Sequence, residues 1–289
     1  MIALLFSILA SSAIFVIFKL FERYGIDTFQ AIVYNYFTAF LCGIFLFGHE
    51  WTDDVVTQSD WIYATLGCSL LFISLFILIG ISSQRNGVGT TSVAVKMSMA
   101  LSILAMILLY NEPVHFLKLL GIGLAFVGVI LTSYTSSQKS NSGSSALWML
   151  AVLFVGSSML DLVLNYSLKH LLGALSPSLF SAFGFGIAGT IGSIILFLQV
   201  FQGKSKLQAK NVLAGVLLGI PNFFSIYLLL MAYQTSGLTD SNVVTIVNIG
   251  IVGLSALLGW SLFKETMTTR KLLGLVLCLV AIALISING

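Results

Sequence analysis

Residues 115–134 read HFLKLLGIGLAFVGVILTSY, and this stretch decides the class of fold. Among Lys, Arg, Asp and Glu it contains only Lys118, near its start. A helix rises about 1.5 Å per residue and the hydrocarbon of a bilayer is about 30 Å thick, so about 20 apolar residues cross it. The stretch is therefore predicted to be a transmembrane helix.

Comparable apolar runs fill the chain on both sides of this stretch. The 289 residues are 58% hydrophobic and 8% charged, with a mean hydropathy of +1.06, whereas a soluble domain carries about 25% charged residues. Backbone polar groups in lipid need internal partners, and long runs without the alternation of barrel strands favour helices. We therefore expect an all-α integral membrane protein with ten transmembrane helices, at Ile2–Leu20, Phe29–Phe47, Trp61–Ser82, Val88–Tyr110, His115–Tyr134, Ala146–Leu168, Pro177–Val200, Asn211–Tyr233, Ser241–Phe263 and Lys271–Ile287.

A polar segment divides the chain near its middle. Residues 133–145 read SYTSSQKSNSGSS, a composition typical of a flexible linker. LKLLG at 117–121 is echoed by RKLLG at 270–274, each five residues after a glutamate, and SSQRNG ending at Gly87 is echoed by AYQTSG ending at Gly237. Five spans per half is an odd number, so the second half enters the membrane from the opposite face. We expect two inverted five-helix repeats around a central cavity, at 1–135 and 146–289, joined by a linker loop at 136–145.

The distribution of basic residues predicts the orientation. With the N-terminus outside, two basic residues lie in outside loops, Lys118 and Lys169. The cytoplasmic ends then carry ten, namely Lys19, Arg23, Arg85, Lys139, Lys204, Lys206, Lys210, Lys264, Arg270 and Lys271. Because cytoplasmic loops are enriched in Lys and Arg, we expect a multi-pass protein of the plasma (inner) membrane with both termini outside.

Several classes of function lack their sequence signature. The net charge of +3 comes from groups between the apolar runs, without a basic stripe that would bind nucleic acid. No GxxxxGK[ST] loop for ATP is present. The cysteines lie inside predicted spans and the histidines near span ends, and neither set has the spacing of metal ligands. We expect no cofactor, no metal and no disulfide from Cys42, Cys68, Cys278, His49, His115 and His170.

Two segments carry a family resemblance. They are LLYNEPVHFLKLLGIGLAFVGVILTS at 108–133 and LFKETMTTRKLLGLVLCLVAIALIS at 262–286. With ten spans duplicated five by five and one Glu closing the fourth span of each half, the chain resembles the drug/metabolite transporter superfamily, specifically its EamA-like members. The resemblance implies EamA-like repeats around a central cavity, and export or import of amino acids, other metabolites, sugar phosphates or drugs. Many members carry a proline within the fourth span of a half, where this chain has Met97–Met99 and Asn248–Gly250.

Ten spans in two inverted halves favour a secondary transporter over two other classes. We expect alternating access with export of a small polar or amphipathic metabolite, amino-acid-like or anionic. The alternative is an intramembrane enzyme acting on a lipid or an exported intermediate. Such an enzyme needs converging catalytic groups, and only Lys96 and Asp161 are both charged and deep in spans, so we assign no catalytic residue. A channel would show rings of charge or a carbonyl filter. The expected partners are the substrate, the bilayer and protons, and the expected state is a monomer or weak homodimer.

Lys96 is the most informative residue because it lies near the middle of the fourth span. A charge there costs about 2.5–3.5 kcal/mol on insertion scales, so it faces a cavity or a partner. It either binds an anionic group of the substrate or exchanges a proton, or it pairs with Asp161, or it faces a solvated vestibule. Asp161 is either a proton-coupling carboxylate or a group near the span end that water reaches.

Uncharged polar side chains predict the lining of the cavity. On the sixth span, Ser157, Ser158, Asp161 and Asn165 recur at spacings of three and four, which places them on one face. The alternative is hydrogen bonding between helices, which contributes about 0.6 kcal/mol per bond. The predicted substrate-binding set is Lys96, Asn35, Ser98, Asn165, Tyr166, Asn222, Tyr227 and Asn248, with Asp161 for proton coupling.

Other features are interpreted as structural. Glu112 and Glu265 lie at span ends, where pairing with interface residues is ordinary. Small residues spaced by four predict close helix packing rather than a site. Pro177 is expected to begin the seventh span and Pro221 to kink the eighth. The small-residue ridges are Gly184, Ala188 and Gly192, and Gly215 with Gly219.

Overall fold

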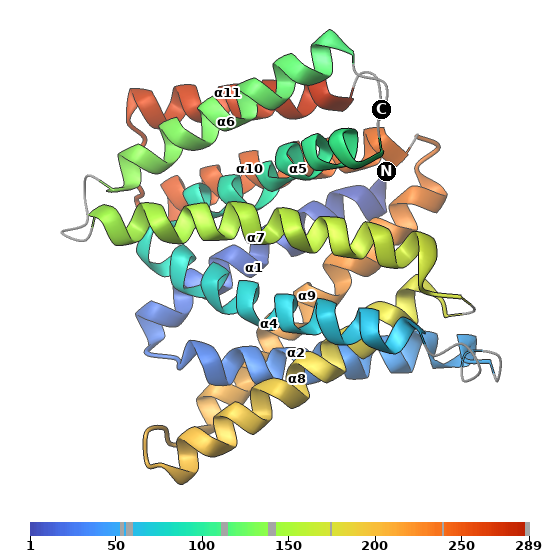
Figure 1. Cartoon of the computed structure of the whole chain (residues 1–289). Coiled ribbons are helices and arrows are strands. Elements are labelled where there is room, and N and C mark those ends of the chain that lie inside the picture. The colour runs from blue at the N-terminus through green and yellow to red at the C-terminus, as the bar shows by residue number, and fades with distance from the viewer. Residues whose placement is uncertain are drawn as a thin grey trace. The chain divides into compact units, whose positions relative to one another are not determined.

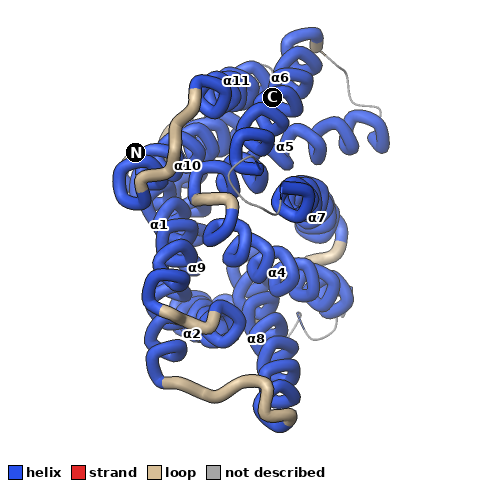
Figure 2. The backbone as a smooth tube through the Cα atoms, turned by 90° about the vertical axis from the view of Figure 1, so that its left-hand side faces the viewer, coloured by secondary structure: helices blue, strands red, loops and turns tan. Residues whose placement is uncertain are grey.

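The computed structural model describes residues 1–52, 55, 60–110, 115–137, 143–173, 175–238 and 240–286. These residues form helices and connecting loops without strands (Figure 2). Ten helices are long and apolar enough to cross a membrane, which confirms the all-α prediction. The elements are α1 (Ile2–Tyr24), α2 (Thr28–Phe47), the short 3-10 helix η1 (Gly48–Glu50), α4 (Asp60–Arg85), α5 (Val88–Tyr110), α6 (Phe116–Ser137), α7 (Gly143–His170), α8 (Pro177–Phe201), α9 (Ala209–Thr235), α10 (Asp240–Phe263) and α11 (Thr269–Ser286).

Helix ends differ from the predicted spans where the chain leaves the apolar region. The α5 bounds agree with prediction, whereas α6 and α7 both extend into the Ser-rich segment. Apolarity marks where lipid ends, but the backbone hydrogen-bond ladder continues beyond it. Pro177 begins α8 as predicted, with Ser176 as its N-cap, whose Oγ accepts the N–H of Leu179 at 3.3 Å.

The chain forms two compact units, each built from both halves of the sequence. Unit 1 comprises Met1–Leu20, Leu78–Met159 and Ser225–Gly289, and unit 2 comprises Phe21–Ile77 and Leu160–Phe224. Helices α1, α4, α7 and α9 contribute residues to both units. The remaining transmembrane helices belong wholly to one unit.

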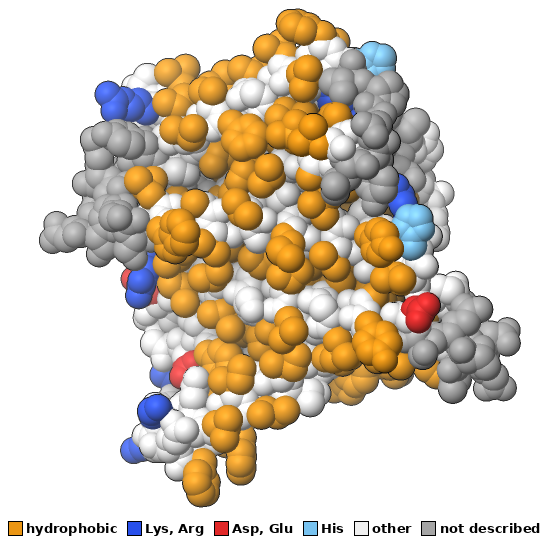
Figure 3. Space-filling model, in the orientation of Figure 1, with side chains coloured by type: hydrophobic (Ala, Val, Ile, Leu, Met, Phe, Trp, Pro, Cys, Tyr) orange, Lys and Arg blue, Asp and Glu red, His pale blue; other side chains and the backbone are white. Residues whose placement is uncertain are grey.

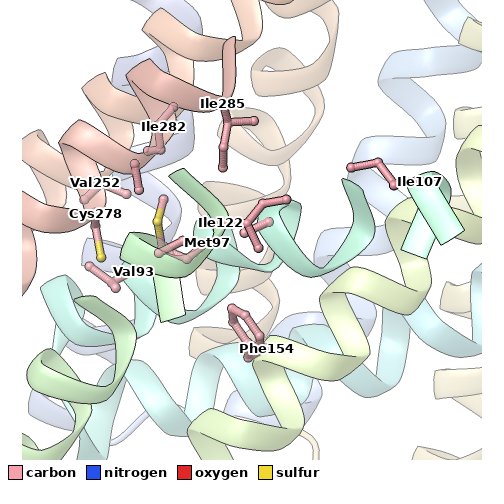
Figure 4. Close-up of a cluster of buried hydrophobic side chains, with 12 residues drawn as sticks. Val93, Met97, Ile107, Ile122, Phe154, Val252, Cys278, Ile282 and Ile285 are labelled. Carbon is pink, nitrogen blue, oxygen red and sulfur yellow. The ribbon is translucent and has the colours of Figure 1, made fainter. Parts of the chain in front are cut away.

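Unit 1 contains two antiparallel helix pairs, α6 with α11 and α5 with α10 (Figure 1). A Cβ added to Gly128 of α6 would lie 2.9 Å from the carbonyl oxygen of Gly274 of α11, so these backbones are in contact. One apolar cluster of this unit, shown in Figure 4, includes Met97, Phe154 and Ile282. A second cluster includes Phe15, Val88, Val247 and Ile251. Apolar packing and close backbone contact thus hold unit 1 together.

Unit 2 is organised around α2, which packs antiparallel to α8. A Cβ on Gly192 would lie 2.8 Å from Val33, and one on Gly184 would lie 3.2 Å from Phe72. On α9, a Cβ on Gly215 would lie 2.6 Å from the Ala31 carbonyl oxygen, and one on Gly219 would lie 2.7 Å from that of Asn35. These contacts confirm that both small-residue ridges serve close helix packing.

The exposed surface of both units is apolar. Phe45 and Phe201 are 88% and 84% exposed, and Figure 3 shows hydrophobic side chains spread over the visible faces of both units. Water would penalise such a surface, whereas lipid solvates it. The surface is therefore that of a protein embedded in a bilayer.

Candidate functional site

The predicted binding residues are divided between the two units. Unit 1 contains Lys96, Ser98, Tyr227 and Asn248, and unit 2 contains Asn35, Asp161, Asn165, Tyr166 and Asn222. Among those of unit 1, the structure brings Lys96 and Asn248 to the same pair of packed helices, α5 and α10. This helix pair is the part of the predicted site whose geometry can be followed in detail.

The contact between α5 and α10, here the α5–α10 seam, is fixed at two points. A Cβ on Gly89 would lie 3.0 Å from the Cα of Ala256. Nearly three turns further along α5, the Sδ of Met99 accepts a hydrogen bond from the Nδ2 of Asn248 at 3.4 Å. Helical residues spaced by three, four or seven share a face. Lys96, seven residues after Gly89 and three before Met99, therefore lies on the face of α5 that packs against α10.

The burial of the two polar residues suits a site within the membrane. Lys96 is half-buried and Asn248 is 8% exposed. A thioether is a weak hydrogen-bond acceptor. The Asn248 amide can therefore exchange its contact with Met99 for a stronger acceptor at small cost.

Hydroxyl groups near Lys96 bond within the protein. The Oγ of Ser98 donates to the Val95 carbonyl oxygen at 2.6 Å. The Oγ of Ser102 donates to the Ser98 carbonyl oxygen at 3.1 Å and lies 3.2 Å from the Oγ of Ser158 on α7. The first two bonds stay on α5 and the third links two helices, as expected for serine in lipid. A role for Ser98 in binding substrate stays a prediction.

Asn35 presents a buried polar atom in unit 2. Its side chain is completely buried, and its Nδ2 lies 3.5 Å from the Ile32 carbonyl oxygen. Its Oδ1 has no hydrogen-bond partner among the described residues. An unsatisfied buried acceptor costs about 1–3 kcal/mol, so a water molecule or a ligand would stabilise this position.

The polar stripe predicted on the sixth span corresponds to α7. Its members Ser157 and Ser158 are buried in unit 1, whereas Asn165 of unit 2 is half-buried and Asp161 is exposed. Tyr166 is exposed and its ring lies 4.9 Å from that of His170, centroid to centroid. Lys96 and Asp161 belong to different units, so a pair between them stays a prediction, as does the proton-coupling role. Asn222 is 6% exposed and Tyr227 is half-buried, both on α9.

A polar network in unit 2 escaped the sequence interpretation. Gln30, which is 1% exposed, donates through Nε2 to the Ser205 Oγ at 2.7 Å and to the Lys206 carbonyl oxygen at 2.9 Å. Its Oε1 accepts from the Asn211 Nδ2 at 2.8 Å, and the Asn211 Oδ1 accepts from the Asp27 N–H at 3.1 Å. We call these residues the Gln30 clamp. The sequence did contain a signal for this network, because Gln30 and Asn211 are polar residues at the starts of two predicted spans.

The possible metal ligands in the described part of the chain are its His, Cys, Asp and Glu side chains. Among the residues that the structure describes, no three His, Cys, Asp or Glu side chains gather as a metal site would require. Cys42, Cys68 and Cys278 are free thiols. The predictions of no metal and no cofactor stay predictions.

Ten membrane-crossing helices with polar side chains on buried faces define a multi-pass α-helical membrane protein. The EamA-like transporter family model matches residues 1–134 and 144–287. An uncharacterized protein of Haemophilus influenzae is 30% identical over 286 residues, which cover 96% of this chain and 95% of that protein. A protein of known crystal structure, 13% identical, has a TM-score of 0.58 over 96% of both chains and thus shares the fold.

The chain belongs to the EamA-like transporter family, within the drug/metabolite transporter superfamily. This confirms the resemblance carried by the two segments at 108–133 and 262–286. Members of this family are transporters rather than enzymes.

Proposed function

We propose that this protein is a secondary transporter that exports a small polar or amphipathic metabolite, anionic or amino-acid-like, by alternating access. The observation that carries the proposal is the position of Lys96 on the α5–α10 seam, three residues before Met99, whose thioether accepts from Asn248. A half-buried ammonium group in a span is costly unless it serves a ligand or a partner. Membership of the EamA-like transporter family supports transport as the function of this protein.

The donors on the seam favour an anionic group of the substrate. Lys96 supplies a positive charge, and Asn248 supplies an amide donor whose present acceptor is the Met99 thioether. Hydrogen bonds between charged partners are about twice as strong as neutral ones. A carboxylate accepts from both donors, and Asn35, Asn165, Tyr166, Asn222, Tyr227 and Ser98 are proposed as further contacts.

Helix pairing supports an inverted repeat around a central cavity. The three antiparallel pairs α2 with α8, α5 with α10 and α6 with α11 join the second, fourth and fifth spans to the seventh, ninth and tenth. These are the equivalent helices of two five-span repeats. An antiparallel arrangement of equivalent helices is what opposite insertion of the repeats requires.

Contacts near helix ends support the proposed topology. In unit 1, the Nζ of Lys19 donates to the Gln84 carbonyl oxygen, and in unit 2 Gln30 bonds to Ser205. Each contact joins two parts of the chain that the basic residues assign to the same side of the membrane. We propose an inner-membrane protein, monomeric or weakly dimeric, with both termini outside and with proton coupling through Asp161.

Transport by purified protein tests the role of Lys96. A thermal-shift screen of amino acids and small carboxylates first identifies a ligand, because binding to the folded state raises its stability by RT ln(1 + [L]/Kd). Uptake of that radiolabelled ligand into proteoliposomes is then compared for the parent, Lys96→Ala and Lys96→Arg. We expect Lys96→Ala to lower uptake at least about tenfold, because a hydrogen bond to a charged group contributes about 1.5–3 kcal/mol.

Lys96→Arg should retain part of the uptake, since the charge remains. The matched control is Ser261→Ala on α10, an exposed residue whose hydroxyl donates to the Leu257 carbonyl oxygen at 2.8 Å and whose loss should leave uptake within about twofold of the parent. Unchanged uptake by both Lys96 variants would remove Lys96 from the binding site.

A further inference from the structure

Glu265, in the loop between α10 and α11, places its carboxylate in a small space between two glycines. A Cβ added to Gly87 would lie 2.7 Å from both carboxylate oxygens, and one added to Gly259 would lie 2.8 Å from Oε2. Gly87 is in the turn between α4 and α5 with φ +93°, a conformation that side chains disfavour. Only residues without a Cβ at both positions leave room for the carboxylate in this position.

The carboxylate makes two charge-assisted contacts. Its Oε1 accepts the backbone N–H of Val88, the first residue of α5, with an N···O distance of 2.5 Å. Its Oε2 lies 3.2 Å from the Nζ of Lys271, and the two side chains are 11% and 9% exposed. Glu265 thus caps α5 from another part of the chain and is neutralised by Lys271. The pairing predicted for this span end is confirmed, and Glu112 lies outside the described residues.

The turn that Glu265 holds is itself well ordered by hydrogen bonds. The hydroxyls of Ser82 and Thr91 are 2.8 Å apart across the turn, and the Nδ2 of Asn86 donates to the Ser82 Oγ at 3.0 Å. The N–H of Thr91 bonds to the Gly87 carbonyl oxygen at 3.2 Å. A displacement of Val88 is therefore expected to move the whole first turn of α5.

We propose that Glu265 is a latch that closes the α5–α10 seam at the end where α5 begins. Gly89 packs against the Ala256 backbone next to the held residue Val88, so α5 and α10 cannot separate at this end while the carboxylate stays bound. Opening the seam toward this side requires Glu265 to leave Val88. Glu265 is a positioning residue, since it acts on Lys96 through α5. The inference goes beyond the proposed function, and its test needs no substrate.

Side-specific labelling of a cysteine in the seam tests the latch. Ser92 of α5 is fully buried, lies one turn before Lys96, and its hydroxyl donates to the Gly89 carbonyl oxygen at 2.9 Å. In proteoliposomes, a Ser92→Cys reporter is exposed to a membrane-impermeant maleimide added to the side on which α5 begins. Peptide mass spectrometry counts labelling at this position alone, so Cys42, Cys68 and Cys278 remain in place.

We expect Glu265→Gln to raise the labelling rate about tenfold, because loss of the charge shifts the equilibrium toward the open seam. A second reporter, Ser102→Cys, lies further along α5 and should be labelled at the parent rate. An unchanged rate at Ser92→Cys would overturn the latch. An equal rise at both reporters would also overturn it, because general loosening of the fold would then explain the result.

A matched pair of glycine substitutions tests the latch with the Glu265 side chain intact. Gly87→Ala places a methyl group where the carboxylate lies and should raise labelling as Glu265→Gln does. Gly237 also has a positive φ, +71°, but an added Cβ meets no described atom within 4 Å. Gly237→Ala therefore imposes a similar backbone strain without displacing Glu265, and labelling should match the parent. Equal effects of the two substitutions would assign the result to strain and refute the latch.

Discussion

Unit 1 and unit 2 fasten the ends of their helices by different chemistry. In unit 2, the Gln30 clamp distributes the task over several hydrogen bonds between amides, a hydroxyl and backbone carbonyls, and of the bonds from the Gln30 Nε2 only the one to the Asp27 carboxylate, at 3.4 Å, has a charged acceptor. In unit 1, a single carboxylate, Glu265, holds the start of α5 and is paired with Lys271. The loss of one neutral bond leaves the others intact, whereas the loss of one charge leaves its buried partner uncompensated.

This difference indicates which unit is built to change. A network in which several bonds share the load fails gradually and suits a part that stays rigid. A contact through one ion pair has two discrete states, held and released, which is what a conformational switch needs. We therefore expect the helix ends joined by the Gln30 clamp to stay together while the α5–α10 seam of unit 1 opens. The following predictions test that contrast, beginning with the largest expected effect.

Breaking the ion pair from the cationic side should have the largest effect on stability. Lys271→Met leaves the Glu265 carboxylate buried without its cation, and removal of one partner of a buried pair costs about 3–5 kcal/mol. The partial exposure of both groups places the expected loss near the lower end, about 3 kcal/mol in the free energy of unfolding in detergent. The double variant Glu265→Gln/Lys271→Met should lose less, because no charge is left buried. A double variant as unstable as the sum of both single ones would contradict coupling between the two groups.

Filling a glycine contact in unit 2 should have an intermediate effect. Gly215→Ala places a Cβ 2.5 Å from that of Tyr34 and 2.6 Å from a backbone oxygen of α2, so helices must move apart. Overpacking of this kind costs about 1–3 kcal/mol. Gly123→Ala on α6 is the matched control, because its Cβ meets no described atom within 4 Å. Thermal unfolding of both variants in detergent should show a lower midpoint for Gly215→Ala alone, and equal midpoints would refute close α2–α9 packing.

Much of this fold could be predicted because the bilayer restricts what a sequence can do. The thickness of the hydrocarbon sets the length of an apolar run, so the bounds of α5 could be predicted to the residue. Small residues spaced by four have few uses in lipid other than close packing, so the role of Gly215 and Gly219 could also be predicted. Both inferences depend on local sequence alone.

The partners of polar residues could not be predicted in the same way. Lys96 and Asn248 stand out singly as polar residues in apolar spans, but the register of α5 against α10, which brings Asn248 to Met99, decides whether they share one seam. Glu265 pairs with Lys271 across a loop in which Lys264 has φ +53°, a conformation that the sequence does not indicate. Gln30 finds Asn211, 181 residues away. Periodicity identifies the polar face of a helix, whereas tertiary packing decides what that face meets.

The Gln30 clamp itself supplies the smallest of the predicted effects. Ser205→Ala removes one neutral hydrogen bond from Gln30, whose Nε2 keeps its bond to the Lys206 carbonyl oxygen. A single neutral bond contributes about 0.5–1.5 kcal/mol, so unfolding should become easier by less than about 1.5 kcal/mol. Gln30→Leu should cost more than Ser205→Ala, since it also leaves the Asn211 amide without this acceptor. Hydrogen exchange at the start of α9 should rise in the same order. If Ser205→Ala instead destabilised the protein as much as Lys271→Met, the clamp would fail as a single unit and the contrast between the two units would be lost.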